Sequence, residues 1–235
     1  MTVVLVASEA VPFSKTGGLA DVAGALPKAL AARGGKVCLF TPAYRGSVGK
    51  AVEVARIRVP LGGAELSGRV LRASLGDADA YLVDHPAFFD RPALYGEGGK
   101  DYPDNAERYA FFARAVLEAC RVLGLAPSVV HAHDWQAGLV PALLKTTLKD
   151  EPAFRSTATV FTVHNMGYQG LFPKAALAVT GLPASAFTPD GVEYWDQVGY
   201  LKAGLSYADL LTTVSPTHAR EVQTPEYGRG LEGLM

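Results

Sequence analysis

Short apolar runs alternate with segments of helical periodicity at the start of the chain. Val3–Ala7 and Lys36–Thr41 are apolar runs of strand length, and the apolar residues of Ala20–Arg33 recur every three or four positions. This order predicts a strand, a helix and a second strand, with Gly34–Gly35 ending the helix. The segments therefore form a βαβ unit. The face expected to be buried in this helix consists of Val22, Ala25, Leu26, Ala29 and Leu30.

The alternation continues over the rest of the chain. Further helices are expected at Asn105–Leu123, at Ala137–Leu148 and from Pro216 onward; further strands are expected at Ser128–His131, Thr157–Val163 and Leu210–Val214. Strands joined through helices are connected by right-handed crossovers, lie parallel and are covered on both faces. The pattern predicts an α/β fold with a Rossmann-like, mostly parallel sheet.

Two segments depart from this alternation. Val52–Leu75 alternates apolar and polar residues on either side of Gly62–Gly63, which predicts an antiparallel hairpin added to the sheet. Asp90–Pro103 is irregular and rich in Gly, Asp and Tyr, and loops of this kind often line binding sites.

Composition fits one globular domain with a near-neutral surface. The chain has 235 residues, 49% of them hydrophobic, with 22 Lys and Arg against 23 Asp and Glu. This balance offers no basic footprint for nucleic acid or for an anionic membrane. Cys38 and Cys120 sit in apolar runs and are expected to be buried thiols. Because no apolar run is long enough to cross a bilayer and Met1 leads directly into a strand, we expect a cytoplasmic protein.

Ligands of open parallel sheets bind beyond the carboxyl ends of the strands, and three polar segments follow predicted strand ends. The first contains Lys15 and Gly17–Gly18 at the start of a predicted helix. Glycines there permit close backbone approach, and the free helix N–H groups together with Lys15 attract an anion such as a diphosphate. The residue order matches neither a Walker loop nor the dinucleotide fingerprint. Taken alone, Gly17–Gly18 fits an ordinary turn with a solvated lysine better than a ligand site.

The second polar segment is His131–Gln136. Strand alternation places His131 and His133 on one face, and with Asp134 they resemble the ligand pattern of a metallohydrolase. A metal would need further ligands from elsewhere, so buried, hydrogen-bonded histidines are the alternative that we favour. The other histidines of the chain are His85, His164 and His218.

The third polar segment is Thr162–Gly170, which contains His164 and Asn165 followed by Tyr168. Imidazole and amide groups can hydrogen-bond the hydroxyls of a polyol, and a tyrosine ring can pack on a sugar face. A structural loop is the alternative. Because the carboxyl ends of parallel strands meet at one edge, we expect the three segments to line a single cleft.

Six strings along the chain share the order and spacing of one enzyme family. They are Lys15–Val22, Ala93–Gly96, Asp101–Asn105, His131–Trp135, His164–Asn165 with Tyr168–Gly170, and Thr213–Thr217. Together they make the whole chain resemble bacterial glycogen synthases and plant starch synthases, and the string beginning Lys15–Thr16–Gly17–Gly18 is the most specific.

The resemblance implies a retaining glycosyltransferase of the GT-B fold. Such an enzyme transfers glucose from ADP-glucose to the non-reducing end of an α-1,4-glucan and releases ADP, without a cofactor or metal. Residues 1–235 would be the N-terminal, acceptor-side domain of a glycogen synthase. Its partner would be a C-terminal nucleotide-binding domain that this chain lacks, so the chain by itself is expected to be inactive or nearly so.

The family's substrate-binding residues carry over to four matching positions. Lys15 and Gly18 would lie at the phosphates of the donor, and Asp21 and Tyr95 would lie near the nucleotide sugar.

The catalytic positions carry over to the later strings. His164 would touch the transferring glucose and Asp134 would lie where acceptor and sugar meet, both as orienting groups with no nucleophilic role. Asn165, beside His164, would bind substrate hydroxyls.

Two other classes of function stay open. One is a non-catalytic glucan-binding module, and the other is a metal-dependent hydrolase built on His131, His133 and Asp134. Sucrose synthases and phosphorylases share the two-domain architecture, but the Lys15 loop argues against both. The preference for ADP-glucose over UDP-glucose is an expectation taken from the bacterial family.

Overall fold

An eight-stranded sheet forms the centre of the computed structural model, which describes residues 1–235. The strand order is β13-β9-β8-β1-β2-β5-β4-β3. The strands are β1 (Thr2–Val6), β2 (Lys36–Pro42), β3 (Val52–Leu61), β4 (Ala64–Leu75), β5 (Ala78–Asp84), β8 (Val129–His133), β9 (Ala158–Val163) and β13 (Leu210–Thr213). The strands from β13 to β5 are parallel, and β4 and β3 are antiparallel. The predicted parallel sheet with an added hairpin is confirmed.

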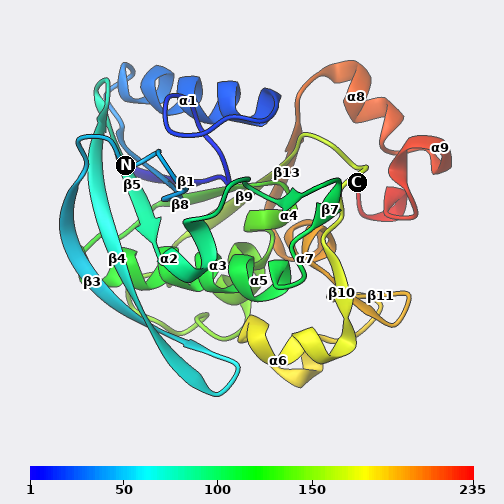
Figure 1. Cartoon of the computed structure of the whole chain (residues 1–235). Helices are drawn as coiled ribbons and strands as arrows, with labels where there is room; N and C mark the ends of the chain where they lie inside the picture. The colour runs from blue at the N-terminus through cyan, green and yellow to red at the C-terminus, as the bar shows by residue number, and fades with distance from the viewer.

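Helices cover both faces of this sheet. They are α1 (Gly18–Ala31), α2 (Pro86–Phe89), α3 (Asn105–Val122), α4 (Asp134–Ala137), α5 (Leu139–Lys145), α6 (Leu177–Thr180), α7 (Tyr200–Tyr207), α8 (Pro216–Glu221) and α9 (Pro225–Gly228). Figure 1 shows α1 on one side of the sheet and α3, α5 and α7 on the other. None of the helices combines the length and apolar character that crossing a bilayer requires.

Short elements fill the connections. They are the pair β6 (Gly96–Glu97) and β7 (Lys100–Asp101), the small sheet of β10 (Leu171–Pro173), β11 (Glu193–Tyr194) and β12 (Gln197–Gly199), and the 3₁₀ turns Lys174–Ala176, Ala184–Ala186 and Glu232–Leu234. The helix expected over Ala137–Leu148 is shorter in the structure, where α5 begins at Leu139 and ends at Lys145 and Gly138 separates it from α4.

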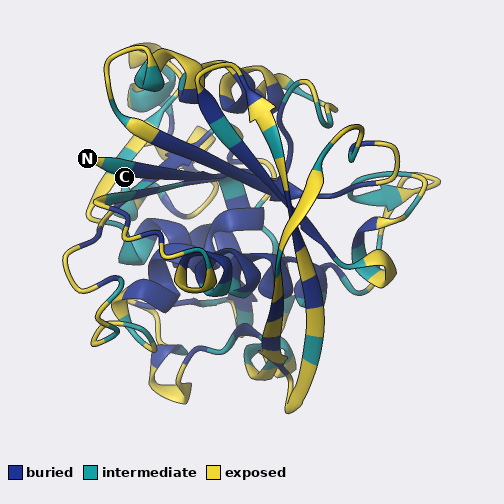
Figure 2. Ribbon diagram, turned by 90° about the vertical axis from the view of Figure 1, so that its left-hand side faces the viewer, coloured by how far each residue is buried: buried dark blue, intermediate teal, exposed yellow.

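The two faces of the sheet bury cores of unequal size. Alternate residues of β1 point to opposite sides, with Val4 and Val6 in a cluster of 47 buried residues and Val3 and Leu5 in a cluster of 14. The larger core packs against α3, α5 and α7, and the smaller one lies under α1. Figure 2 shows the central strands buried along most of their length, whereas buried and exposed residues alternate along the far end of the β3–β4 hairpin.

The buried face of α1 differs from the expected one. Val22 is 37% exposed, and the buried residues of the helix are Leu19, Ala20, Ala23, Gly24 and Pro27. The cause is a close backbone contact, since a Cβ at Gly24 would lie 2.4 Å from the carbonyl oxygen of Val11. The helix therefore makes its closest approach through Ala20, Ala23 and Gly24, while Leu26 and Leu30 of the expected face are only partly buried.

The sequence pattern gives no prediction for Ala78–Asp84, which forms β5. This strand pairs parallel with β2 and antiparallel with β4, so it joins the hairpin to the parallel part of the sheet. Cys38 and Cys120 are buried free thiols, as expected.

Substitution of Gly138 by alanine is expected to destabilise the fold. A Cβ at this position would lie 1.9 Å from the carbonyl oxygen of Tyr200, where the chain between α4 and α5 touches α7. Forcing these backbones apart should lower the free energy of unfolding by about 3 kcal/mol. Urea denaturation measures the loss, with Gly233→Ala as control because a Cβ there would meet nothing within 4 Å. Equal stability of the two variants would contradict the expectation.

Candidate active site

The carboxyl ends of β1, β8 and β9 meet at one edge of the sheet. β1 lies between β2 and β8. The chain runs from β1 to β2 on one side and later returns to form β8 on the other side, so the strand order changes direction at β1. A crevice at such a switch in strand order is where open α/β sheets bind ligands. A cavity of about 1230 Å³ opens there, walled by the loop before α1, the segment around β6 and β7, the ends of β8 and β9, and Arg229.

Five of the seven predicted site residues line this cavity. They are Gly18, Tyr95, Asp134, His164 and Asn165. The expected single cleft at the strand ends is therefore present.

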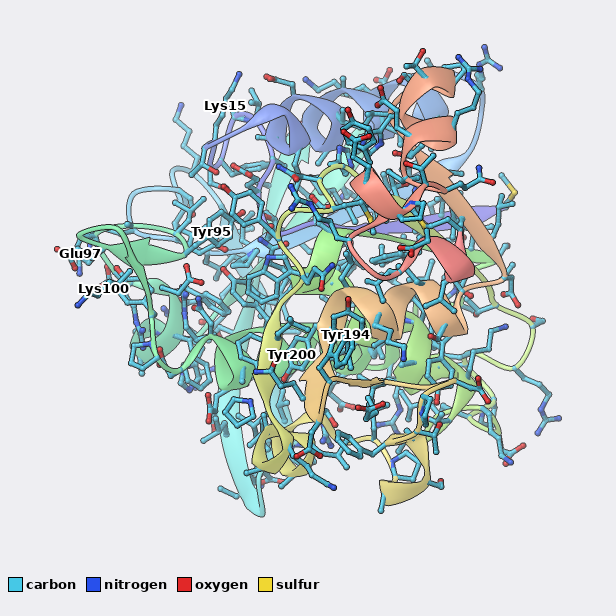
Figure 3. All side chains as sticks on the ribbon, turned by 90° about the vertical axis from the view of Figure 1, so that its right-hand side faces the viewer. Lys15, Tyr95, Glu97, Lys100, Tyr194 and Tyr200 are labelled. Atoms are coloured by element: carbon cyan, nitrogen blue, oxygen red, sulfur yellow. The ribbon has the colours of Figure 1, made fainter.

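Lys15 and Asp21 lie outside the cavity lining. The Lys15 Nζ atom is 2.7 Å from Asp21 Oδ1, and both side chains are more than half exposed. Figure 3 shows Lys15 beside the start of α1, above Tyr95. The structure thus pairs these two residues with each other, next to the cavity.

The glycine loop is held by a carboxylate that the motif analysis did not single out. Glu9 is buried, and its carboxylate accepts hydrogen bonds from the backbone N–H of Thr16 and, at 3.0 Å, from the Thr16 hydroxyl. A Cβ at Gly18 would meet no atom within 4 Å, so the backbone there borders open space. The sequence signal for Glu9 was an acidic residue two positions after the apolar run Val3–Ala7.

Asp134 joins the ends of β8 and β9. Its Oδ1 accepts a hydrogen bond of 2.7 Å from the backbone N–H of His164, and its backbone is left-handed, with φ of 56°. Burial raises the pKa of Asp134 to about 7, although the backbone N–H groups of His164 and Asn165 pull in the opposite direction. A residue held in this conformation at a strand end is typical of functional sites.

Three histidines form a stacked, hydrogen-bonded group beside Asp134. The rings of His131 and His133 stack with centroids 4.2 Å apart, and His133 Nδ1 lies 3.0 Å from His164 Nε2. Burial lowers the pKa of His131 and of His164 to about 4, and that of His133 well below its usual value. All three rings are therefore neutral at pH 7.

The histidine group gives no support to the metallohydrolase alternative. Rings that stack face to face do not converge on a common point, and no group of three or more His, Cys, Asp or Glu side chains is arranged to hold a metal ion.

Comparison with known proteins identifies the family. The family described as "Starch synthase catalytic domain" matches residues 2–235. The chain belongs to this starch synthase family.

The relatives agree with that assignment. Glycogen synthases of Koribacter versatilis and Syntrophotalea carbinolica are 49% and 46% identical over all of this chain and 49% of their own length. The chain thus spans about half the length of these curated relatives. The catalytic domain of Starch Synthase IV from Arabidopsis thaliana, bound to ADP and acarbose, superposes with a TM-score of 0.88 at 30% identity, covering 98% of this chain and 48% of that one. The GT-B fold class is confirmed for this half.

A buried arginine anchors the Tyr95 wall of the starch synthase-family cavity. Arg108 is fully buried in α3 and donates hydrogen bonds to the carbonyl oxygens of Phe88 and Leu94 and to Asn105 Oδ1. Asn105 Nδ2 in turn donates to the carbonyl oxygen of Tyr95, whose hydroxyl lies 2.8 Å from Ser8 Oγ. The irregular segment expected to line a site is thus fixed to the core, and it presents Tyr95 and Asp101 to the cavity.

Arg229 is the one Lys or Arg among the residues lining the cavity of this family member. Its backbone has a positive φ of 55°, and its carbonyl oxygen accepts hydrogen bonds from Gln169 Nε2 and the Tyr194 hydroxyl. No local motif signalled this residue, because it reaches the cavity from a segment 60 positions beyond Gln169.

The neutral histidines make the stability of this starch synthase-family chain depend on pH. Below about pH 6.5 the unfolded chain protonates each histidine, whereas the folded chain protonates His131 and His164 only near pH 4, so stability falls as pH falls through this window. Asp134 acts in the opposite sense, because the folded chain keeps its proton up to about pH 7. The three histidines together change the stability more over this pH range than the single Asp134 carboxyl group does, so acid lowers the stability.

We therefore expect His131→Gln to reduce the loss of unfolding free energy between pH 7 and pH 4.5 by about 2 kcal/mol. Glutamine places an amide near the ring Nε2, which hydrogen-bonds Thr162 Oγ1. Urea denaturation at a series of pH values provides the measurement. An unchanged pH dependence would mean that His131 takes up its proton equally in both states.

Proposed function

We propose that this chain is the acceptor-side half of a glycogen synthase. The enzyme transfers glucose, with retention, from ADP-glucose to the non-reducing end of an α-1,4-glucan. The observation that carries the proposal is the single cavity in which Gly18, Tyr95, Asp134, His164 and Asn165 come together. A volume of about 1230 Å³ exceeds the usual range of about 300–1,000 Å³ for a small-molecule site, which suits a sugar donor together with the end of a glucan.

The relatives support the substrate classes. The bacterial relatives are glycogen synthases, and the Arabidopsis starch synthase that superposes on 98% of this chain holds ADP and acarbose. We infer an adenine nucleotide sugar as donor and a glucan as acceptor.

The proposed transfer breaks the bond between the glucose C1 and the diphosphate oxygen and forms one between C1 and the acceptor O4. The proton of the acceptor hydroxyl passes to the leaving diphosphate. His164 and Asp134 orient the sugar hydroxyls, and the ionised Asp134 carboxylate stabilises the positive charge that develops on the sugar, so their contribution is positional and electrostatic. Neither residue forms a covalent bond to glucose.

Lys15 is proposed to leave Asp21 and meet the donor diphosphate. The exposed pair binds weakly in water, so exchanging one carboxylate for a doubly charged diphosphate is favourable. Lys15→Gln should raise KM for ADP-glucose about tenfold with a smaller change in kcat. The control is Lys28→Gln, at an exposed lysine in the last turn of α1, the helix that follows the Lys15 loop. Equal effects of the two substitutions would remove Lys15 from the donor site.

The other half of the enzyme is proposed to be a nucleotide-binding domain that closes over the cavity. It would supply further positive charge for the diphosphate, since Arg229 is the one cation in the cavity lining of this half and Lys15 lies beside the cavity. Residues 1–235 would accordingly bind substrates weakly and transfer little glucose by themselves.

Transfer of radiolabelled glucose to glycogen tests the proposal directly. The chain of 235 residues is compared with a protein extended to the length of its relatives, termed the extended protein, with ADP-glucose and UDP-glucose in parallel. Transfer from ADP-glucose by the extended protein alone is the expected result. Glucan binding without transfer by the extended protein would replace the proposal with a binding module.

A further inference from the structure

His133 is a buried residue to which the proposed transfer gives no role. It is the last residue of β8, is fully buried, and has its Nδ1 3.0 Å from Nε2 of His164. Its other ring nitrogen, Nε2, is buried and has no hydrogen-bond partner. His133 therefore makes its one ring hydrogen bond to the histidine that faces the substrate cavity.

The contact between the two rings has only two arrangements. Both histidines are neutral at pH 7, so each ring carries one N–H and one lone pair. Either His133 Nδ1–H donates to His164 Nε2, or His164 Nε2–H donates to His133 Nδ1. The first arrangement buries an unpartnered lone pair at His133 Nε2, and the second buries an unpartnered N–H there.

Unpartnered buried N–H groups are the rarer of the two in proteins. We propose that His133 donates its Nδ1–H to His164 Nε2 and thereby fixes His164 as the tautomer with its proton on Nδ1. His133 is thus a positioning residue for the active site, an inference that rests on the proposed function where it concerns glucose transfer.

The consequence appears at the other side of the His164 ring. His164 lines the cavity, its Nδ1 makes no hydrogen bond within the protein, and this atom is not among the buried unpartnered ones. With the proton on Nδ1, His164 presents a hydrogen-bond donor to a sugar oxygen. The opposite tautomer would present only an acceptor.

The surroundings hold the His133 ring in the orientation that this requires. His131 stacks on it with an interplanar angle of 27°. His131 Nε2 is hydrogen-bonded to Thr162 Oγ1, which lies 2.7 Å from Thr212 Oγ1. The ring plane is therefore fixed by side chains of three neighbouring strands, β8, β9 and β13.

The tautomers can be measured on a protein that has no enzymatic activity. In the 235-residue chain labelled with ¹⁵N-histidine, two-bond ¹⁵N–¹H correlations at pH 7.5 report which ring nitrogen carries the proton, and the signals of His164 are assigned by their loss in His164→Asn. We expect the proton of His164 on Nδ1 and that of His133 on Nδ1. A proton on His164 Nε2 overturns the inference.

Kinetics of the extended protein separate positioning from packing. His133→Asn keeps an amide donor at the place of Nδ1, whereas His133→Phe keeps the ring and removes the donor. We expect His133→Phe to lower kcat about tenfold or more with KM for ADP-glucose within about twofold, and His133→Asn to restore most of kcat. Equal kcat in the two variants, at matched thermal stability, contradicts the positioning role.

The histidine spectra and the kinetics together keep the inference distinct from the proposed function. If His133→Phe does not fold, the tautomer of His164 in His133→Asn decides, with retention of the Nδ1 proton expected and its loss contradicting the inference. If the unaltered extended protein transfers no glucose, the proposed function fails, and the spectra of the 235-residue chain alone confirm or overturn the tautomer.

Discussion

Replacement of His164 by alanine in the extended protein is expected to lower kcat about 10²- to 10³-fold while KM for ADP-glucose changes by less than about threefold. The ring lines the cavity beside Asp134 and is neutral at pH 7, since burial lowers its pKa to about 4. A neutral donor that holds the sugar in the orientation needed for transfer affects turnover more than ground-state binding of the donor. Steady-state kinetics with varied donor and saturating glycogen provide the measurement.

His164→Asn is the matched control for this experiment. Its amide can place a donor near the position of Nδ1, so it should retain more turnover than alanine. Equal losses in kcat and in donor affinity for the alanine variant would remove His164 from the proposed orienting role.

Replacement of Asp134 by alanine should damage both stability and activity. The carboxylate accepts the backbone N–H of His164, and the left-handed backbone at φ of 56° is less costly for Asp or Asn than for Ala. We expect the free energy of unfolding to fall by about 2–4 kcal/mol in Asp134→Ala. Asp134→Asn should fold with near-normal stability, because it tolerates the same backbone and keeps an acceptor. Equal destabilisation by both substitutions would show that the charge itself holds the loop.

The same pair of variants predicts a change in the pH profile. Burial raises the pKa of Asp134 to about 7, so the ionised fraction grows as pH rises through 7. If the anion stabilises positive charge on the sugar, kcat of the extended protein should rise through this window. Asp134→Asn should reduce kcat about 10²-fold or more and lose the rise between pH 6 and 8. A rise of the same size in Asp134→Asn would assign it to another group.

The sequence predicted the parallel sheet, the hairpin and most of the cavity because those depend on local pattern. Val3–Ala7 and Lys36–Thr41 are apolar runs of strand length that form β1 and β2, and residues after strand ends must meet at one edge of a parallel sheet. The placement of Gly18, Asp134, His164 and Asn165 along one cavity follows from that topology, whereas Tyr95 was expected near the site only from the family resemblance.

Other features depend on contacts between distant segments. The buried face of α1 is decided by the approach of Gly24 to the backbone of Val11, a contact that hydrophobic periodicity does not record. The backbone of Arg229 is held at the cavity because its carbonyl oxygen accepts hydrogen bonds from Gln169 Nε2 and the Tyr194 hydroxyl. The pairing of Lys15 with Asp21 is likewise a choice among exposed partners, which spacing alone does not fix.

The unequal cores divide the molecule into layers that differ in resistance to local opening. α1 rests on a cluster of 14 buried residues and contributes mainly small side chains, whereas α3 is buried within a cluster of 47. Transient separation of α1 from the sheet exposes less apolar surface, so its amide protons exchange with solvent at a lower free energy than those of α3. Because the glycine loop leads into α1, the wall of the cavity that carries Gly18 belongs to the layer that opens at the lower free energy, whereas Asp134 and His164 lie at the edge of the central sheet.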